Sequence, residues 1–128
     1  MKKTFVIAED NINTMQFYIE TLVSLGVNKK DINYFYDGSS AIDFIENNKL
    51  ENAFLLTDYN MPNNSGGEVL KYSFENNFTY RLIRSANSKS YLIEILEKKY
   101  NLKNGFIVIN KDEPVEILIS EIKEYLTI

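Results

Sequence analysis

Short apolar runs alternate with longer segments of helical periodicity along this chain, and the alternation predicts a mixed α/β fold. Largely apolar runs extend from Thr4 to Ala8, from Ala53 to Asp58 and from Phe106 to Ile109, and they have the length and composition of buried strands. Weaker patterns predict two further strands, from Tyr34 to Tyr36 and from Tyr80 to Ala86. We therefore expect five strands.

Five segments carry apolar residues at helical spacing, and each of them follows one of the predicted strands. The recurring positions are Met15, Tyr18, Ile19, Leu22 and Leu25; Ala41, Ile42 and Ile45; Val69, Leu70 and Phe74; Leu92, Ile95 and Leu96; and Val115, Leu118, Ile119, Ile122 and Leu126. Strands that alternate with helices in this way form a parallel sheet with helices on both faces, which is a three-layer α/β sandwich.

Capping residues mark where the predicted helices begin and end. The candidates are Asn11 to Asn13 before the first helix, Gly26 after it, Ser39 or Ser40 before the second helix, Ser88 before the fourth, and Pro114 in the first turn of the fifth. The turn-forming residues between helices and strands agree with the same division of the chain.

Composition excludes several classes of function. The 128 residues suit one domain, residues 1–128, and 45% hydrophobic residues allow a real core. The net charge of −4, without a long cluster of Lys or Arg, argues against a nucleic-acid surface. The absence of His and Cys excludes His-based catalysis, His-bearing zinc sites, disulfides and thiol chemistry. Because no apolar run is long enough for a signal peptide or a membrane span, we expect a cytoplasmic protein.

Polar residues stand at the ends of four of the predicted strands. Glu9 and Asp10 follow the first strand, Asp58 ends the third, Ser85 lies at the end of the fourth, and Lys111 follows the fifth. The carboxyl ends of parallel strands meet at one edge of the sheet, so we expect these five side chains to lie together. Taken alone, Asp58 is a candidate nucleophile or metal ligand, or an aspartate that caps the following turn.

The combination of residue types points to phosphoryl chemistry. Three carboxylates that lie together repel one another, which raises their pKa values unless a hard cation neutralises them. Mg²⁺ suits such a site because it takes oxygen ligands and uses only one or two carboxylates together with water and phosphate oxygens. A lysine and a hydroxyl nearby can bind a phosphoryl group. Asp58 is thus equipped to become an aspartyl phosphate.

The chain resembles the receiver domain of two-component response regulators, and its length resembles the single-domain, CheY-like type. The resemblance is carried by the acid pair Glu9-Asp10, by Asp58 in the segment DYNMPNNSG, by Ser85-Ala86 and by Lys111. It implies a doubly wound, flavodoxin-like sheet. The strand order of such sheets, 2-1-3-4-5, does not follow from the hydrophobic pattern.

The resemblance also implies a role for each residue of the acidic group. Asp58 is the phosphoacceptor, and Asp10 and Asp58 bind Mg²⁺ directly, together with the backbone carbonyl of Asn60. Glu9 acts through water.

The same resemblance makes Ser85 the switch hydroxyl and Lys111 the counter-ion of the phosphoryl group. The implied function is a phosphorylation-dependent signalling switch that accepts its phosphoryl group from a histidine kinase or a phosphotransfer protein. Phosphorylation and dephosphorylation are self-catalysed, so the protein is not an enzyme in the sense of substrate turnover. A protein partner is expected on the surface formed by the fourth helix, the fifth strand and the fifth helix. We expect a monomer, with a dimer on activation as the alternative.

Three departures from the family pattern leave other interpretations open. Asp112 follows the lysine where receivers usually have proline, and we predict a trans peptide bond there because a cis bond before a non-proline residue costs about 2.5–4 kcal/mol. Val108 occupies the position of the usual switch aromatic. Arg84, beside the switch hydroxyl, either approaches the phosphoryl group or a partner, or packs its stem with its head in water; we favour the second interpretation.

Two alternatives to the signalling switch follow. The chain could be a receiver fold that binds partners without phosphorylation, which the departures favour and the intact acids and lysine oppose. It could also be the receiver part of a larger hybrid kinase, although the initial Met and the predicted C-terminal helix favour a complete protein.

Overall fold

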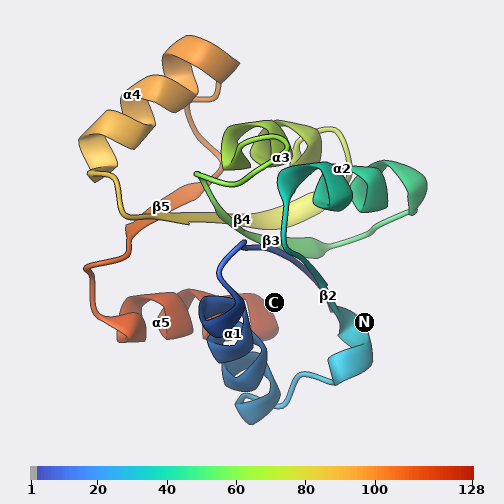
Figure 1. Cartoon of the computed structure of the whole chain (residues 1–128). Helices are drawn as coiled ribbons and strands as arrows, with labels where there is room; N and C mark the ends of the chain where they lie inside the picture. Colours follow the sequence, from blue (N-terminus) through green and yellow to red (C-terminus); the bar gives the residue numbers. More distant parts are fainter. Residues whose placement is uncertain (1–2) are drawn as a thin grey trace.

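A single parallel sheet of five strands forms the centre of the computed structural model, which describes residues 3–128 (Figure 1). The strands are β1 (Thr4–Ala8), β2 (Ile32–Phe35), β3 (Ala53–Asp58), β4 (Phe78–Ser85) and β5 (Ile107–Asn110). They pair in the order β2-β1-β3-β4-β5, and every pair is parallel. The predicted α/β class and the implied strand order are confirmed.

Helices cover both faces of the sheet. They are α1 (Ile12–Ser24), α2 (Gly38–Asn47), α3 (Gly66–Ser73), α4 (Lys89–Tyr100) and α5 (Val115–Leu126), and a short 3₁₀ helix, η1 (Lys29–Asp31), precedes β2. Helices α1 and α5 lie on one face, and α2, α3 and α4 lie on the other (Figure 1). Two hydrophobic cores, one on each side of the sheet, result from this arrangement.

The central strands are buried as their sequences predict. All six residues of β3 are buried, and so are four of the five residues of β1. On the α1 and α5 face, the rings of Phe5, Phe54 and Tyr125 all contact one another, with centroids 5.0 to 5.2 Å apart. Each fully buried aromatic or aliphatic side chain of this kind contributes about 1.5–3 kcal/mol. Phe5 and Phe54 are opposite each other in the register of β1 and β3, so this packing stabilises the pairing of the two strands.

Local capping signals place most helix ends correctly. Asn11 caps α1 by accepting a hydrogen bond from the backbone N–H of Thr14 (2.9 Å), and Gly26 follows its last turn with a φ of +96°, which glycine adopts without strain. Ser88 caps α4 as predicted. The prediction that Ser39 or Ser40 caps α2 is wrong, because Asp37 takes that place and its Oδ1 accepts from the N–H of Ser40 (2.7 Å).

Several boundaries differ from the predicted ones. Strand β2 begins at Ile32, earlier than the expected Tyr34, and the side chain of Asn33 is accommodated because it donates to the backbone carbonyl of Phe5 (3.1 Å). Strand β4 begins at Phe78, and β5 is shifted by one residue to end at Asn110. Pro114 precedes α5 as its N-cap and does not lie in its first turn. Long-range strand pairing decides these ends, which local propensity does not determine.

Arg81, unusual in a buried strand, is satisfied by local partners at the start of β4. Its Nε donates to the Ser73 hydroxyl (2.9 Å), one Nη donates to the Phe78 carbonyl (2.9 Å), and its guanidinium lies 3.8 Å from the centroid of the Phe74 ring. These contacts place it far along the strand from Asp58, which pairs with Arg84 instead. Arg81 is therefore a structural residue.

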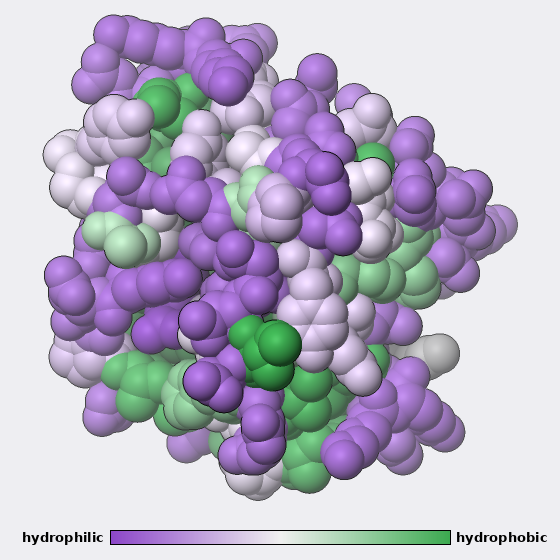
Figure 2. All heavy atoms as spheres, viewed as in Figure 1, coloured by the Kyte–Doolittle hydropathy of each residue, from purple (hydrophilic) through white to green (hydrophobic). Residues whose placement is uncertain are grey.

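Hydrophilic residues cover most of the face shown in Figure 2, and hydrophobic ones form small separate areas. The large apolar side chains that are exposed include Ile12, Phe17 and Val23 on α1, Tyr91 and Ile93 on α4, and Ile117 on α5. Across residues 3–128, none of the helices has the length and hydrophobicity that a membrane span needs.

Candidate functional site

The predicted site residues converge at the carboxyl edge of the sheet. Because β1 and β3 are neighbours in register, with Ala8 opposite Thr57, the acids that follow Ala8 and Thr57 come out side by side. Glu9 is completely buried and Asp58 is 7% exposed, whereas Asp10 is exposed. The carboxylates of Glu9 and Asp58 are therefore buried, and solvent reaches the site from the side of Asp10.

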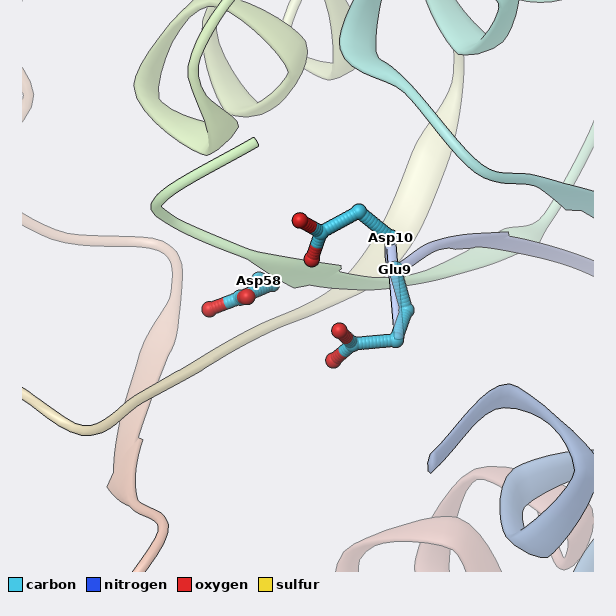
Figure 3. A group of neighbouring side chains, drawn as sticks. All are labelled: Glu9, Asp10 and Asp58. Carbon is cyan, nitrogen blue, oxygen red and sulfur yellow. The ribbon is translucent and has the colours of Figure 1, made fainter. Parts of the chain in front are cut away.

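Glu9, Asp10 and Asp58 form an acidic cluster. Each offers a carboxylate oxygen, and these atoms all lie within 4.8 Å of one another. Figure 3 shows the three carboxylates projecting from the neighbouring ends of β1 and β3 toward the same space. An all-oxygen donor set of this spacing, with one ligand accessible to water, fits a hard divalent cation such as Mg²⁺.

The electrostatics of the two buried carboxyls agree with this fit. Burial raises the pKa of Asp58, and the nearby ammonium of Lys111 opposes that rise only in part. Burial also raises the pKa of Glu9; the N–H of Asn11, which donates to Oε2 (3.1 Å), lowers it, and the charge of Asp58 raises it further. Burial thus disfavours the charged form of both carboxyls, and a nearby cation would favour it.

Lys111 supplies the positive charge nearest the acids. Its Nζ lies 3.3 Å from Asp58 Oδ2 and 3.5 Å from Glu9 Oε1. Burial alone lowers the pKa of Lys111, but the charges of Asp58 and Glu9 outweigh burial and the pKa is raised. The backbone N–H of Lys111 donates to the carbonyl of Ser85 (2.8 Å), so the ends of β4 and β5 are joined at this point. Lys111 is therefore brought together with the acids, and Ser85 is joined to Lys111 through the backbone.

Ser85 lies at the end of β4, and its hydroxyl is hydrogen-bonded to Asn87. The residue is 1% exposed, and its Oγ donates to Oδ1 of Asn87 (2.8 Å) and accepts from the N–H of the same residue (3.2 Å). The Asn60 side chain donates to the same Oδ1 (3.0 Å). Asn60 thus joins the group through its side-chain amide, whereas the resemblance had assigned a role to its backbone carbonyl.

The loop after β5 takes a regular course without proline. The Lys111–Asp112 bond is trans, which confirms the prediction, and the N–H of Asp112 donates to Oδ1 of Asn110 (2.7 Å). The N–H of Asn110 in turn donates to Oε1 of Glu113 (3.0 Å). Val108, at the position of the usual aromatic, packs partly buried against the core beneath α2, α3 and α4.

Arg84 is bound to α1 and does not simply extend into water. Its Nη1 donates to the hydroxyl of Tyr18 (3.0 Å), while its Nε is buried without a hydrogen-bond partner. The interpretation that the head reaches water is therefore wrong for Nε. Burial raises the pKa of Tyr18 and the neighbouring Arg84 lowers it in part. The pair ties β4 to α1 directly beside the acidic cluster.

Asn87 and Asn110 are the residues near the site that the sequence interpretation missed. Besides its contacts with Ser85 and Asn60, Asn87 accepts a hydrogen bond at its backbone carbonyl from the side chain of Asn110 (2.7 Å). Asparagine two residues after a serine is typical of a tight turn, and that signal could have drawn attention to the first of them. The contact with Asn110 joins residues 23 positions apart and carries no local signal.

Solved structures of receiver domains share this fold over nearly the whole chain. The chemotaxis response regulator CheY4 of Vibrio cholerae is 20% identical, with a TM-score of 0.72 over 98% of both chains. The response regulator receiver domain from Rhodospirillum rubrum is 23% identical, with a TM-score of 0.71 over 94% of this chain and 89% of that one. The receiver domain of the hybrid histidine kinase CckA is 18% identical, with a TM-score of 0.69 over 98% and 99%. No family model and no curated protein sequence matches the chain.

These likenesses define the class of fold. The chain has the α/β fold of the CheY-like receiver domains of response regulators, with five parallel strands in one sheet and a cluster of three acids at its carboxyl edge.

Proposed function

We propose that the protein is a phosphorylation-dependent signalling switch in which residues 1–128 form a single receiver domain and Asp58 accepts the phosphoryl group. The observation that carries the proposal is the contact of Lys111 with Asp58 at 3.3 Å, inside a cluster of three carboxylates. The donor is a histidine kinase or a phosphotransfer protein, and the site of action is the cytoplasm.

The proposed metal site consists of Asp10, Asp58 and the backbone carbonyl of Asn60, with Glu9 acting through water. Bound Mg²⁺ would neutralise the negative charge of the carboxylates and of the phosphoryl oxygens. The raised pKa values of Glu9 and Asp58 support this assignment, since burial disfavours the charged form of both carboxyls and a bound cation would offset that cost.

The chemical step requires an ionised Asp58. One carboxylate oxygen forms a bond to phosphorus while the bond from phosphorus to the donor's nitrogen breaks, and the nitrogen leaves with the electron pair. Lys111 Nζ, already beside Asp58 Oδ2, can bind the transferred phosphoryl oxygens as a point charge. The Tyr59 N–H, which donates to Asp58 Oδ1 (2.8 Å), orients the carboxylate. The Ser85 hydroxyl is the second proposed ligand of the phosphoryl group.

Phosphate incorporation tests the assignment of Asp58. We expect acetyl phosphate and Mg²⁺ to add one phosphoryl group to the protein, detectable by intact-protein mass spectrometry. Asp58→Asn abolishes the addition because the nucleophilic oxygen is replaced. Asp43→Asn, at an exposed position in the middle of α2, is the matched control and leaves it unchanged. Equal incorporation in the Asp58 and Asp43 variants would refute the proposal, and the phosphorylation-independent interaction module would then be favoured.

The proposed output surface is formed by α4, β5 and α5. Ser85 and Lys111 lie at the entrances to α4 and α5, so a phosphoryl group that contacts both changes the relative stability of the conformations of these elements. Tyr91, Ile93 and Ile117 expose apolar surface there for a protein partner. Because Val108 has no ring to turn inward, we expect loop and backbone movement to carry the change.

Backbone NMR with and without beryllofluoride tests this surface. We expect shifts in residues 91–100 and 106–118. Perturbations confined to the metal site would contradict the assignment. The monomer is the proposed state of the unmodified protein, and a dimer that forms only with beryllofluoride, measured by light scattering, would establish the alternative.

A further inference from the structure

The only hydroxyl proton of Ser85 is already in use. A serine hydroxyl has one O–H to donate, and in Ser85 it is directed to Oδ1 of Asn87 at 2.8 Å. The N–H of Asn87 donates back to the same Oγ at 3.2 Å, so the hydroxyl is held from both sides. A hydroxyl held in this way cannot at the same time donate to an oxygen of a phosphoryl group on Asp58.

Asn87 also joins the three loops that carry the site. Its Oδ1 accepts from the side chain of Asn60, two residues after Asp58, at 3.0 Å. Its backbone carbonyl accepts from the side chain of Asn110, which directly precedes Lys111, at 2.7 Å. One residue therefore contacts the segment after β3, the last residue of β5 and the hydroxyl at the end of β4.

We propose that Asn87 is a positioning residue whose side-chain oxygen holds the Ser85 hydroxyl in the unphosphorylated state and competes with the phosphoryl group for its proton. This inference rests on the proposed function, in which that hydroxyl binds the phosphoryl group. The hydroxyl exchanges one acceptor for the other, so the strength of the Asn87 contact is subtracted from the affinity for the phosphoryl group. Asn87→Ala removes the side-chain amide, and with it the oxygen that accepts from both Ser85 and Asn60, while the main-chain N–H and carbonyl contacts remain.

The expected effect follows from the net value of one hydrogen bond. Removing the competing acceptor tightens binding of beryllofluoride, a stable analogue of the phosphoryl group, by about three- to tenfold. The effect depends on the hydroxyl. It persists when Ser85→Thr retains an O–H and disappears when Ser85→Ala removes it.

A double-mutant cycle tests the competition. Beryllofluoride affinity in the presence of Mg²⁺ is measured for the original protein, for Ser85→Ala and for Ser85→Thr, each with and without Asn87→Ala. A purely structural role of Asn87 changes affinity equally in all three backgrounds, whereas competition for the proton changes it only where a hydroxyl is present. Asn87→Leu, similar in shape and also without an acceptor, replaces Asn87→Ala if circular dichroism shows that the latter is unfolded.

The outcomes distinguish a failure of the Asn87 competition from a failure of phosphoryl binding at Asp58. Tighter binding by Asn87→Ala with Ser85 or Thr at position 85, and no change with Ala there, supports the inference. Unchanged or weaker binding with Ser85 present overturns the inference and leaves the proposed function standing. No binding of beryllofluoride by the original protein overturns both.

Discussion

The Lys111→Met substitution tests the charge balance of the site most directly. It retains most of the side chain's apolar stem and removes the ammonium that lies 3.3 Å from Asp58 and 3.5 Å from Glu9. Two unit charges about 4 Å apart interact by about 4 kcal/mol at an effective dielectric constant of about 20. Removing one member of a buried pair costs about 3–5 kcal/mol. The Lys111 side chain is still 28% exposed and its own desolvation is relieved. We therefore expect a loss of about 2 kcal/mol in the free energy of unfolding.

The loss depends on pH with a defined sign. The pKa values of Asp58 and Glu9 are raised, so both carboxyls lose their charge as the pH falls, and the variant then has no uncompensated anions. The pKa of Lys111 is raised, so the lysine itself stays charged throughout this range and its own deprotonation removes the contribution only at strongly alkaline pH. The difference in the free energy of unfolding between the two proteins is therefore large at about pH 8 and small at about pH 4.

Urea unfolding followed by far-UV circular dichroism, in EDTA, measures the difference. With a slope of about 1–3 kcal/mol per molar urea, the expected loss lowers the midpoint by about 1 M near pH 8. Mg²⁺ narrows the gap, because the variant's acids bind the cation without competition from the lysine. Lys98→Met is the matched control: its ion pair with Glu94 is shorter, at 2.6 Å, but fully exposed, so no measurable change is expected. Equal stability of Lys111→Met and the original protein near pH 8, or an equal loss near pH 4, would refute the reasoning.

Three further predictions concern the surroundings of the site and the core. Gly67→Ala destabilises the protein by about 1–3 kcal/mol because the new Cβ meets the ring of Tyr100. In the Tyr100→Ala background the same glycine replacement is almost neutral, which thermal unfolding of the original protein, the two single variants and the double variant measures. Tyr18→Phe lowers the free energy of unfolding by about 1–2 kcal/mol because it leaves the guanidinium of Arg84 without its hydroxyl partner. The loss is much smaller in the Arg84→Met background, and equal shifts of the urea midpoint in both backgrounds would contradict the pairing. Burial raises the pKa of Tyr125 to about 12, so the stability that the neutral phenol contributes is complete below pH 10 and is lost as the pH rises toward 12. If Tyr125→Phe unfolds at alkaline pH with the same profile as the original protein, the raised pKa of Tyr125 is not the cause of the loss.

The sequence by itself determined the class of fold and which polar residues lie at the carboxyl edge of the sheet. Apolar runs at β1 and β3 predict buried strands because a strand covered on both faces needs side chains of one kind, and the periodicity of α1 and α5 predicts which residues face the core. The acids, the serine and the lysine at strand ends could be assigned to one edge because parallel strands have their carboxyl ends in common. Such signals lie within a few residues of one another, so they can be recognised in a single chain.

Only the tertiary structure decided how these parts meet. The strand order places β1 beside β3, which brings the carboxylate oxygens within 4.8 Å, and no local pattern specifies that order. Tyr18 receives the guanidinium of Arg84 across 66 positions, and Asn87 binds Asn60 across 27. Contacts between distant segments depend on how whole helices and strands pack, because each partner is positioned by its own element and by the register of the sheet, which local propensity does not encode.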